Sequence, residues 1–183
     1  MTQEILIAGF GGQGVLSMGM TLAYAGMLDG KEVSWMPSYG PEMRGGTANC
    51  IVILSSEPIS SPIVTSFDTV VALNQPSLDK FGKSVKKGGN LLYEKSVIIQ
   101  PPTRTDISVF PVEAAHESER LGNKKVANMI MVGALLGVSE AVAADSVMKA
   151  LAKVLPERYH HLIPVNREAV ELGQSLVGNV AQL

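Results

Sequence analysis

The first residues that could do chemistry form a glycine-rich segment between an apolar run and a predicted helix: Gly9, Gly11, Gly12, Gln13 and Gly14. Glycine permits positive φ angles and close approach of the backbone to a ligand, and the free N–H groups at a helix start attract anions. The spacing Gly-x-Gly-x-x-Gly also suits a dinucleotide, which needs an acidic residue at the end of the second strand. Here that strand ends at residues 35–38 without an acid.

Three uses of this segment stay open. The missing acid disfavours NAD, whereas Ser38 and Arg44 could accept the 2′-phosphate of NADP in a stand-alone reductase. A phosphate held by residues 12–15 would suit a small nucleotide-binding regulatory module. The third use is a structural turn or a contact with another subunit.

A second segment, residues 37–46, is more informative because its composition prescribes a fixed, irregular path. It holds two prolines and three glycines together with one residue of each charge, Glu42 and Arg44. Because it follows the second strand, we expect it at the carboxyl edge of the sheet, beside the glycine-rich segment, where open α/β sheets hold ligands. It is either an ordered loop with an internal Glu42–Arg44 pair or a loop that faces an interface or active site.

Asn74 follows the next apolar run and lies at the same predicted edge. Asparagine is a favoured N-cap residue, and proline is favoured in the first helical turn that follows. We therefore expect Asn74 either to cap the helix that begins near Pro76 or to contact a neighbour or ligand.

Other groups of polar residues form no catalytic or metal site in this reading. Glu113, His116 and Glu117 could share one helix face, but a di-iron centre needs more such pairs, and a solvated face is expected. His160 and His161 are adjacent, so on a helix they diverge by about 100° and cannot chelate one ion together.

The remaining candidates are read as parts of the core. Cys50 lies in an apolar run and is expected to be a small buried side chain. Asn128, inside an apolar helix, is expected to hydrogen-bond a backbone group, since an unpaired buried amide costs a few kcal/mol. Neither a Gly-x-Ser-x-Gly turn nor a phosphate-loop lysine occurs in the sequence, so no residue is assigned a chemical step.

Apolar periodicity supplies the elements that position these residues. Strands are predicted at 4–9, 32–36, 48–55, 68–73, 90–93 and 107–112, with a weaker β signal at 97–99. Helices are predicted at 13–28, 76–87 and 125–137, then from Asp145 as N-cap and from Pro164. The first strand, helix and second strand form a βαβ unit. We expect a single domain, 1–183, of α/β class: a three-layer α/β/α sandwich around a mostly parallel, Rossmann-like sheet, with helices gathered toward the C-terminus.

Composition limits the possible partners. Charged residues are 17% and the net charge is −2, so the sequence offers no basic field for nucleic acid, and the low charge suggests that much of the surface meets another protein. The single cysteine excludes a disulfide framework and a cysteine-ligated cluster held by this chain alone. The start lacks a basic leader region, and the apolar run at 126–138 is too short to span a bilayer, so a cytoplasmic protein without membrane contact is expected.

Four segments in order, residues 9–15, 38–46, 72–77 and 127–133, resemble the gamma subunit of 2-oxoacid:ferredoxin oxidoreductases of the 2-oxoglutarate and pyruvate type. The glycine turn alone is not specific. Gly-Gln-Gly followed by Pro-Glu-Met-Arg-Gly-Gly is more specific, and neither loop departs from the pattern of the family.

The resemblance implies a cytoplasmic complex that converts a 2-oxoacid and coenzyme A to acyl-CoA and CO2 while reducing ferredoxin. Thiamine diphosphate is expected between the alpha and beta subunits, and Mg and iron–sulfur clusters are expected in partner subunits. The expected partners are alpha, beta and, in four-subunit forms, delta. This chain is expected to bind none of them, to be inactive alone, and to have the option of forming a homodimer. The short chain resembles the 2-oxoglutarate type more than the pyruvate type.

The resemblance also implies roles for the two loops. The residues expected to face partner subunits or the active site are Ser38, Tyr39, Glu42, Met43, Arg44, Gly45 and Gly46. The glycine-rich turn would support that surface, with Gln13 presenting its amide.

Overall fold

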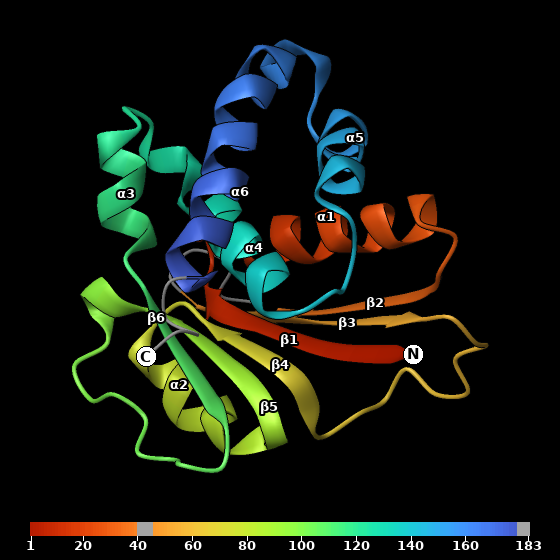
Figure 1. Cartoon of the computed structure of the whole chain (residues 1–183), viewed down its shortest axis with the longest axis vertical. Helices are drawn as coiled ribbons and strands as arrows, with labels where there is room; N and C mark the ends of the chain where they lie inside the picture. The colour runs from red at the N-terminus through yellow and green to blue at the C-terminus, as the bar shows by residue number, and fades with distance from the viewer. Residues whose placement is uncertain (40–45, 179–183) are drawn as a thin grey trace.

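Six strands form one mixed sheet in the order β2-β3-β1-β4-β5-β6 (Figure 1). They are β1 (Thr2–Phe10), β2 (Glu32–Tyr39), β3 (Thr47–Ser55), β4 (Phe67–Ala72), β5 (Val85–Glu94) and β6 (Ser108–Val112). The computed structural model describes residues 1–39 and 46–178. The pairs from β1 to β6 are parallel, whereas β3 is antiparallel to both of its neighbours. The predicted α/β class is confirmed, and the sheet is parallel over the four strands β1, β4, β5 and β6.

The direction of β3 changes the predicted βαβ unit. β1 and β2 point the same way, but β3 lies between them and pairs with both. A nearly continuous apolar run has the same composition whichever way the strand runs, so the sequence pattern carried no signal for this insertion.

The helices cover the two faces of the sheet unequally. One face carries α1 (Val15–Leu28), α4 (Ala127–Val138), α5 (Ala144–Val154) and α6 (Ile163–Gly178), while α2 (Gln75–Phe81) lies against the other (Figure 1). The short α3 (Ala114–Arg120) follows β6. The larger core lies under the four helices, and the smaller core lies between α2 and the β4–β5 half of the sheet. In the described chain α3, α4, α5 and α6 all follow the last strand, so the helices gather toward the C-terminus as predicted.

Close contact between α4 and α6 anchors the helical layer. A Cβ added at Gly173 would collide with the carbonyl oxygen of Ile130, and one added at Gly133 would collide with that of Val170. Both glycines are needed for the two backbones to approach this closely. None of the helices in the described part of the chain is long and apolar enough to cross a membrane.

The start of α5 differs from the prediction. The N-cap residue is Ala143, and Asp145 lies in the first turn, so the prediction of Asp145 as the cap is wrong. The cap comes from the end of α1 instead: the Asp29 carboxylate accepts a hydrogen bond from the Ala143 N–H (2.8 Å) and another from the Ser146 hydroxyl. A carboxylate from a distant part of the chain thus satisfies the helix start.

Two further boundaries are corrected. The helix predicted at 76–87 ends as α2 at Phe81 and continues only as the 3₁₀ turn η1 (Gly82–Ser84), because the chain enters β5 at Val85. The β signal at 97–99 is wrong, since the chain there follows the 3₁₀ turn η2 (Lys95–Val97). The N–H of Ile99 donates to the Gln75 side chain (2.9 Å) rather than to a strand.

Candidate ligand and subunit-contact edge

The glycine-rich turn lies where β1 passes into α1, at the carboxyl edge of the sheet. Gly12 and Gly14 have φ angles of 97° and 81°, which side chains rarely adopt, and Gly14 is the N-cap residue of α1. A Cβ added at Gly14 would also lie 2.7 Å from the Asn128 amide nitrogen. These two glycines are therefore required by backbone conformation, and Gly14 by close packing as well.

Gln13 ties this turn to the end of β4. Its Oε1 accepts a hydrogen bond from the Phe10 N–H (2.7 Å), and its Nε2 donates to the Leu73 carbonyl (3.0 Å). We expected Gln13 to present its amide outward. In the structure the oxygen and the nitrogen of this amide both form hydrogen bonds within the chain. The side chain fixes the distance between two strand ends, which holds the turn in one shape.

Asn74 continues the same network. Its Oδ1 accepts a hydrogen bond from the Ser77 N–H (2.9 Å), and its Nδ2 donates to Gln13 Oε1 (3.3 Å). Asn74 is only 4% exposed. The predicted cap of α2 is confirmed. Its burial and its bond to Gln13 make it part of the scaffold that holds the edge.

Asn128 has a different position from the predicted one. The sequence predicts a backbone hydrogen bond for its amide, whereas the structure places the amide against Gly14, in the wall of a cavity. A partly exposed amide needs no internal partner, because solvent or a ligand satisfies it.

That cavity, of about 270 Å³, opens between the glycine turn, the end of β5 and the start of α4. Its polar lining comes from Gln13, Glu94, Lys124, Lys125 and Asn128. A second hollow of about 290 Å³ lies on the other side of the turn and includes Leu16, Gly46 and Thr47. The turn thus separates a cavity that contains several polar groups from a more apolar one.

The residues that line the first cavity are suited to binding a ligand more than to catalysis. Glu94 is committed to the chain, because its oxygens accept hydrogen bonds from the Ser96 hydroxyl (2.7 Å) and the Ala115 N–H (3.0 Å). Lys124 pairs with Glu119 at 2.9 Å, and this hydrogen bond keeps the pKa of the Glu119 carboxyl below its usual value. Lysines beside a helix start favour an anionic ligand.

The described C-terminal end of the second loop lies beside this turn, as predicted. Phe10 is opposite Thr47 in the sheet, and the Gly11 N–H donates to the Gly46 carbonyl at 3.0 Å. Ser38 is exposed at the end of β2. The predicted contact residues Glu42, Met43, Arg44 and Gly45 lie outside the described residues, as does the side chain of Tyr39. Their roles stay predictions.

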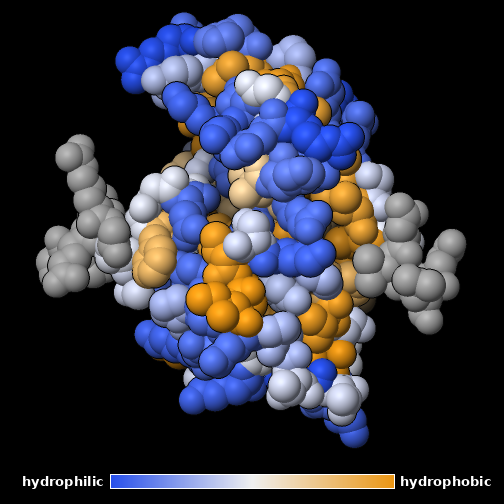
Figure 2. Space-filling view, turned by 90° about the vertical axis from the view of Figure 1, so that its left-hand side faces the viewer, coloured by the Kyte–Doolittle hydropathy of each residue, from blue (hydrophilic) through white to orange (hydrophobic). Residues whose placement is uncertain are grey.

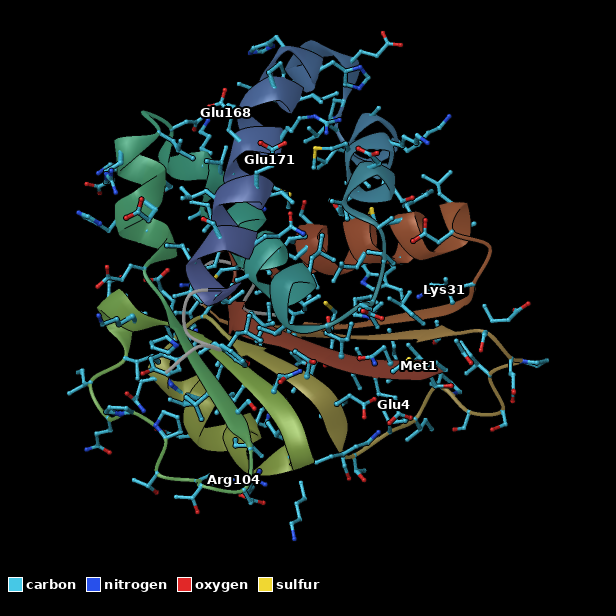
Figure 3. The ribbon with its side chains drawn as sticks, viewed as in Figure 1. Met1, Glu4, Lys31, Arg104, Glu168 and Glu171 are labelled. Atoms are coloured by element: carbon cyan, nitrogen blue, oxygen red, sulfur yellow. The ribbon has the colours of Figure 1, made fainter. Side chains whose placement is uncertain are left out.

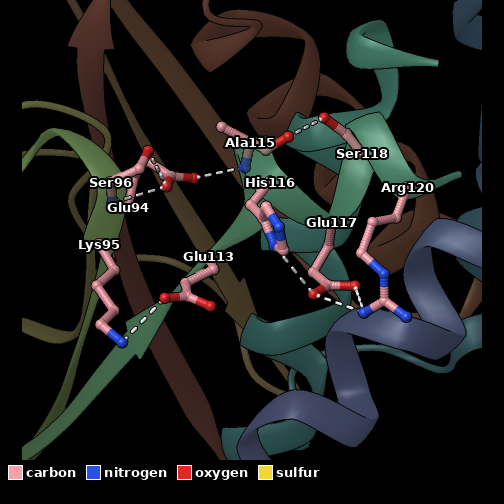
Figure 4. Close-up of polar contacts among 9 residues, drawn as sticks. All are labelled: Glu94, Lys95, Ser96, Glu113, Ala115, His116, Glu117, Ser118 and Arg120. Atoms are coloured by element: carbon pink, nitrogen blue, oxygen red, sulfur yellow. Dashed lines mark hydrogen bonds and ion pairs between the residues drawn. The ribbon is translucent and has the colours of Figure 1, made fainter. Parts of the chain in front are cut away.

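Glu113, the N-cap residue of α3, and Glu117 within the helix have separate partners (Figure 4). Glu113 pairs with Lys95 at 2.9 Å, and this hydrogen bond lowers the pKa of Glu113. Glu117 pairs with Arg120 at 3.0 Å and lies 3.4 Å from the His116 ring. Glu117 is buried, so the prediction of a fully solvated face is wrong at this position.

His160 and Cys50 also have structural surroundings. The ring of His160 hydrogen-bonds the Leu155 carbonyl at 2.9 Å, whereas His161 is exposed. Cys50 is fully buried, as predicted, and burial raises the pKa of its thiol to about 12. A thiol with so high a pKa is neither a nucleophile nor a cluster ligand at neutral pH.

Sequence reasoning missed Glu94, Lys124 and Lys125 as lining residues. Glu94 ends β5, so the argument that placed Asn74 at the carboxyl edge applies to it equally. The two lysines precede α4, and only the packing of that helix brings them to the turn.

The fold and this edge define an open α/β protein with two hollows at the carboxyl ends of its parallel strands. Residues 4–176 match the family model described as "Pyruvate ferredoxin/flavodoxin oxidoreductase", and the chain belongs to this family.

Individual relatives agree with this membership. The chain is 38% identical over 170 residues to ketoisovalerate oxidoreductase subunit VorA of Methanothermobacter thermautotrophicus, covering 93% of this chain but only 35% of VorA. It is 35% identical to 2-oxoglutarate synthase subunit KorC of Methanocaldococcus jannaschii, covering 86% of each chain. The crystal structure of a keto/oxoacid ferredoxin oxidoreductase gamma subunit from Geobacter sulfurreducens superposes with a TM-score of 0.82 at 30% identity over 96% of both chains. The chain thus spans about a third of the VorA length and nearly all of the separate subunits.

Proposed function

We propose that this chain is the gamma subunit of a 2-oxoacid:ferredoxin oxidoreductase complex that depends on thiamine diphosphate. The complex converts a 2-oxoacid, coenzyme A and oxidised ferredoxin to acyl-CoA, CO2 and reduced ferredoxin. The observation that carries the proposal is the match to the G. sulfurreducens gamma subunit over 96% of both chains.

The residues of the chain are consistent with a subunit that holds no redox centre. Its only cysteine is buried between β3 and α1, with a thiol pKa near 12. We assign thiamine diphosphate, Mg and the iron–sulfur clusters to partner subunits of alpha, beta and delta type. The cofactors supply the decarboxylation and electron-transfer chemistry, and this chain contributes surface and shape around them.

The carboxyl edge is the part of the chain that we place next to those partners. The Gln13–Asn74 network makes the glycine turn rigid, and the turn holds the C-terminal end of the 38–46 loop through the Gly11–Gly46 hydrogen bond. A rigid support is what a contact surface requires, since ordering a mobile loop would subtract from the binding free energy. In this proposal Tyr39, Glu42, Met43 and Arg44 face the partners and no residue of this chain performs a chemical step.

The substrate we favour is 2-oxoglutarate. KorC chains match at 34–35% identity, whereas a PorC chain named for pyruvate synthase matches at 28%. Ketoisovalerate is the second candidate: VorA is more identical, at 38%, but the match covers only 35% of VorA, against 86% of KorC. The substrate is bound elsewhere in the complex, so this ranking follows kinship and not a pocket of this chain.

Reconstitution tests the proposal. The tagged chain is purified anaerobically from its own host with the subunits that accompany it, and ferredoxin reduction is measured with 2-oxoglutarate, 2-oxoisovalerate and pyruvate. We expect activity with one of these acids that falls to background when this chain is omitted and returns when it is added back. An isolated chain that binds NAD or NADP in calorimetry and purifies without larger subunits would instead favour a stand-alone reductase.

A further inference from the structure

α1 has the composition of a buried helix although one side of it reaches the surface. No charged residue occurs from Ile5 to Leu28. The other helices at the surface carry exposed charges, for example Lys80, Arg120, Lys149 and Glu168. Figure 3 shows Glu168 and Glu171 on α6, and Lys31 beyond the end of α1. A helix that is apolar on all sides is normally buried on all sides.

The open side of α1 is a continuous row of large apolar side chains. Tyr24, Met27 and Leu28 are 41%, 61% and 51% exposed. Leu16 and Met20 are partly exposed, and spacings of four, four and three place Leu16, Met20, Tyr24 and Met27 on one side of the helix. We call these five residues the α1 stripe.

The fold cannot turn this stripe inward. On the opposite side of α1, a Cβ at Gly19 would collide with Cys50 and one at Gly26 would collide with Leu54. α1 is thus seated through its glycines on β3, and it also packs against β1, β2, α4 and α5. Rotation of the helix would bring larger residues into these close contacts.

The stripe continues toward the candidate edge. Leu16 shares the more apolar hollow with Gly46 and Thr47, next to the end of the 38–46 loop. β2, the edge strand beside α1, is uncharged from Val33 to Tyr39 and contains Pro37. Because proline cannot donate a ladder hydrogen bond, side-chain packing is favoured here over the addition of a strand.

The side of the molecule around α3 and β6 carries charged residues as well as apolar ones. Figure 2 looks onto this side, where apolar areas lie among hydrophilic residues. The α1 stripe differs because the whole helix lacks charge, and a continuous uncharged stretch marks an interaction site.

We propose that the α1 stripe is a permanent docking surface for another polypeptide of the oxidoreductase complex. The inference rests on the function proposed above. In VorA the matching region is 35% of a longer chain, so there this unit is covalently joined to further polypeptide of the same enzyme. An uncharged, core-like surface is typical of obligate interfaces, and the partner surface is apolar at its centre, with charge complementary to Asp29, Lys31 and Glu32 only at one end.

Paired lysine substitutions test this docking. The tagged double variant Tyr24→Lys/Met27→Lys is expressed in the native host and purified anaerobically. The matched control is Glu168→Lys/Glu171→Lys, which places two lysines on the exposed side of α6. Co-purified subunits are quantified by mass spectrometry, and the melting temperature and solution mass of each isolated chain are recorded.

We expect the α1 variant to lose larger subunits about tenfold or more, as a charge at the centre of an apolar interface does, with an unchanged melting temperature. The α6 control and the conservative variant Met27→Leu retain them. Full recovery of the subunits with the α1 variant overturns the docking surface while leaving the proposed function intact. An isolated chain that is dimeric in its natural sequence and monomeric in the variant, with an intact complex, assigns the stripe to a second copy and overturns the proposal. A natural chain that brings down no larger subunit overturns the proposed function as well.

Discussion

α1 and α4 are the two α-helices of the described chain without a charged residue, and they differ in burial. α4 lies between the sheet and α6 and is buried over seven of its residues, Met129–Leu135. α1 has the same kind of composition but keeps the row from Leu16 to Leu28 partly open. The comparison shows that an uncharged composition indicates a helix that is buried. It does not indicate whether the same chain or another polypeptide covers that helix.

The largest effect is expected from a substitution that disrupts the contact between the buried helix α4 and α6. In Gly173→Leu the new side chain would meet the Ile130 carbonyl, where even a Cβ has no room. We expect a loss of about 4 kcal/mol or more in the free energy of unfolding, measured by urea denaturation of the isolated chain. Gly178→Leu is the matched control in the same helix, because a Cβ there meets nothing within 4 Å. Equal stability of the two variants would contradict the close helix crossing.

Truncation of one apolar side chain in each helix compares them directly. Ile130 is fully buried, so Ile130→Ala is expected to lower the free energy of unfolding by about 3 kcal/mol. Met27 is 61% exposed, so Met27→Ala should change it by no more than about 0.5 kcal/mol. A large loss in the second variant, measured on the monomer, would mean that the α1 stripe is already covered within the chain.

The pKa of Cys50 tests whether water is excluded from the side of α1 that packs on β3. Its pKa is raised from 9.0 to about 12 by burial, so between these values the unfolded thiol releases a proton that the folded thiol keeps. The contribution of the thiol to stability is constant well below pH 9. It decreases as the pH rises through 9 toward 12, by about 1.4 kcal/mol per pH unit at most. We expect the natural chain to lose more stability between pH 8.5 and 10 than Cys50→Ala does. Parallel pH profiles of the two proteins would show that the inner side of α1 admits water.

The smallest effect concerns the link from α1 to α5. Asp29→Ala removes the acceptor for the Ala143 N–H and the Ser146 hydroxyl. Loss of a helix cap costs about 1 kcal/mol, which urea denaturation resolves. Asp145 is exposed and lies in the first turn of α5 without capping it, so Asp145→Ala should cost only a few tenths of a kcal/mol. The reverse order would restore Asp145 as the capping residue.

Much of the candidate site could be predicted because its determinants are local. Asn74 followed by Pro76 predicts a helix cap, and the apolar run around Cys50 predicts a buried thiol; both are confirmed. Two segments that follow parallel strands meet at one edge of a sheet, which is why the glycine turn and the 38–46 loop were expected together. The contacts of Glu42 and Arg44 stay predictions.

The sequence by itself determined the α/β class, most of the elements and the uncharged character of α1, because periodicity and composition act within a few residues. Tertiary structure decided the antiparallel insertion of β3, the inward amide of Gln13 and the cap that Asp29 provides across 114 residues. These depend on which surfaces meet after collapse, a property of the whole packed chain. For the same reason, the side of α1 that stays open became visible only once β3 and its glycine contacts fixed the other side.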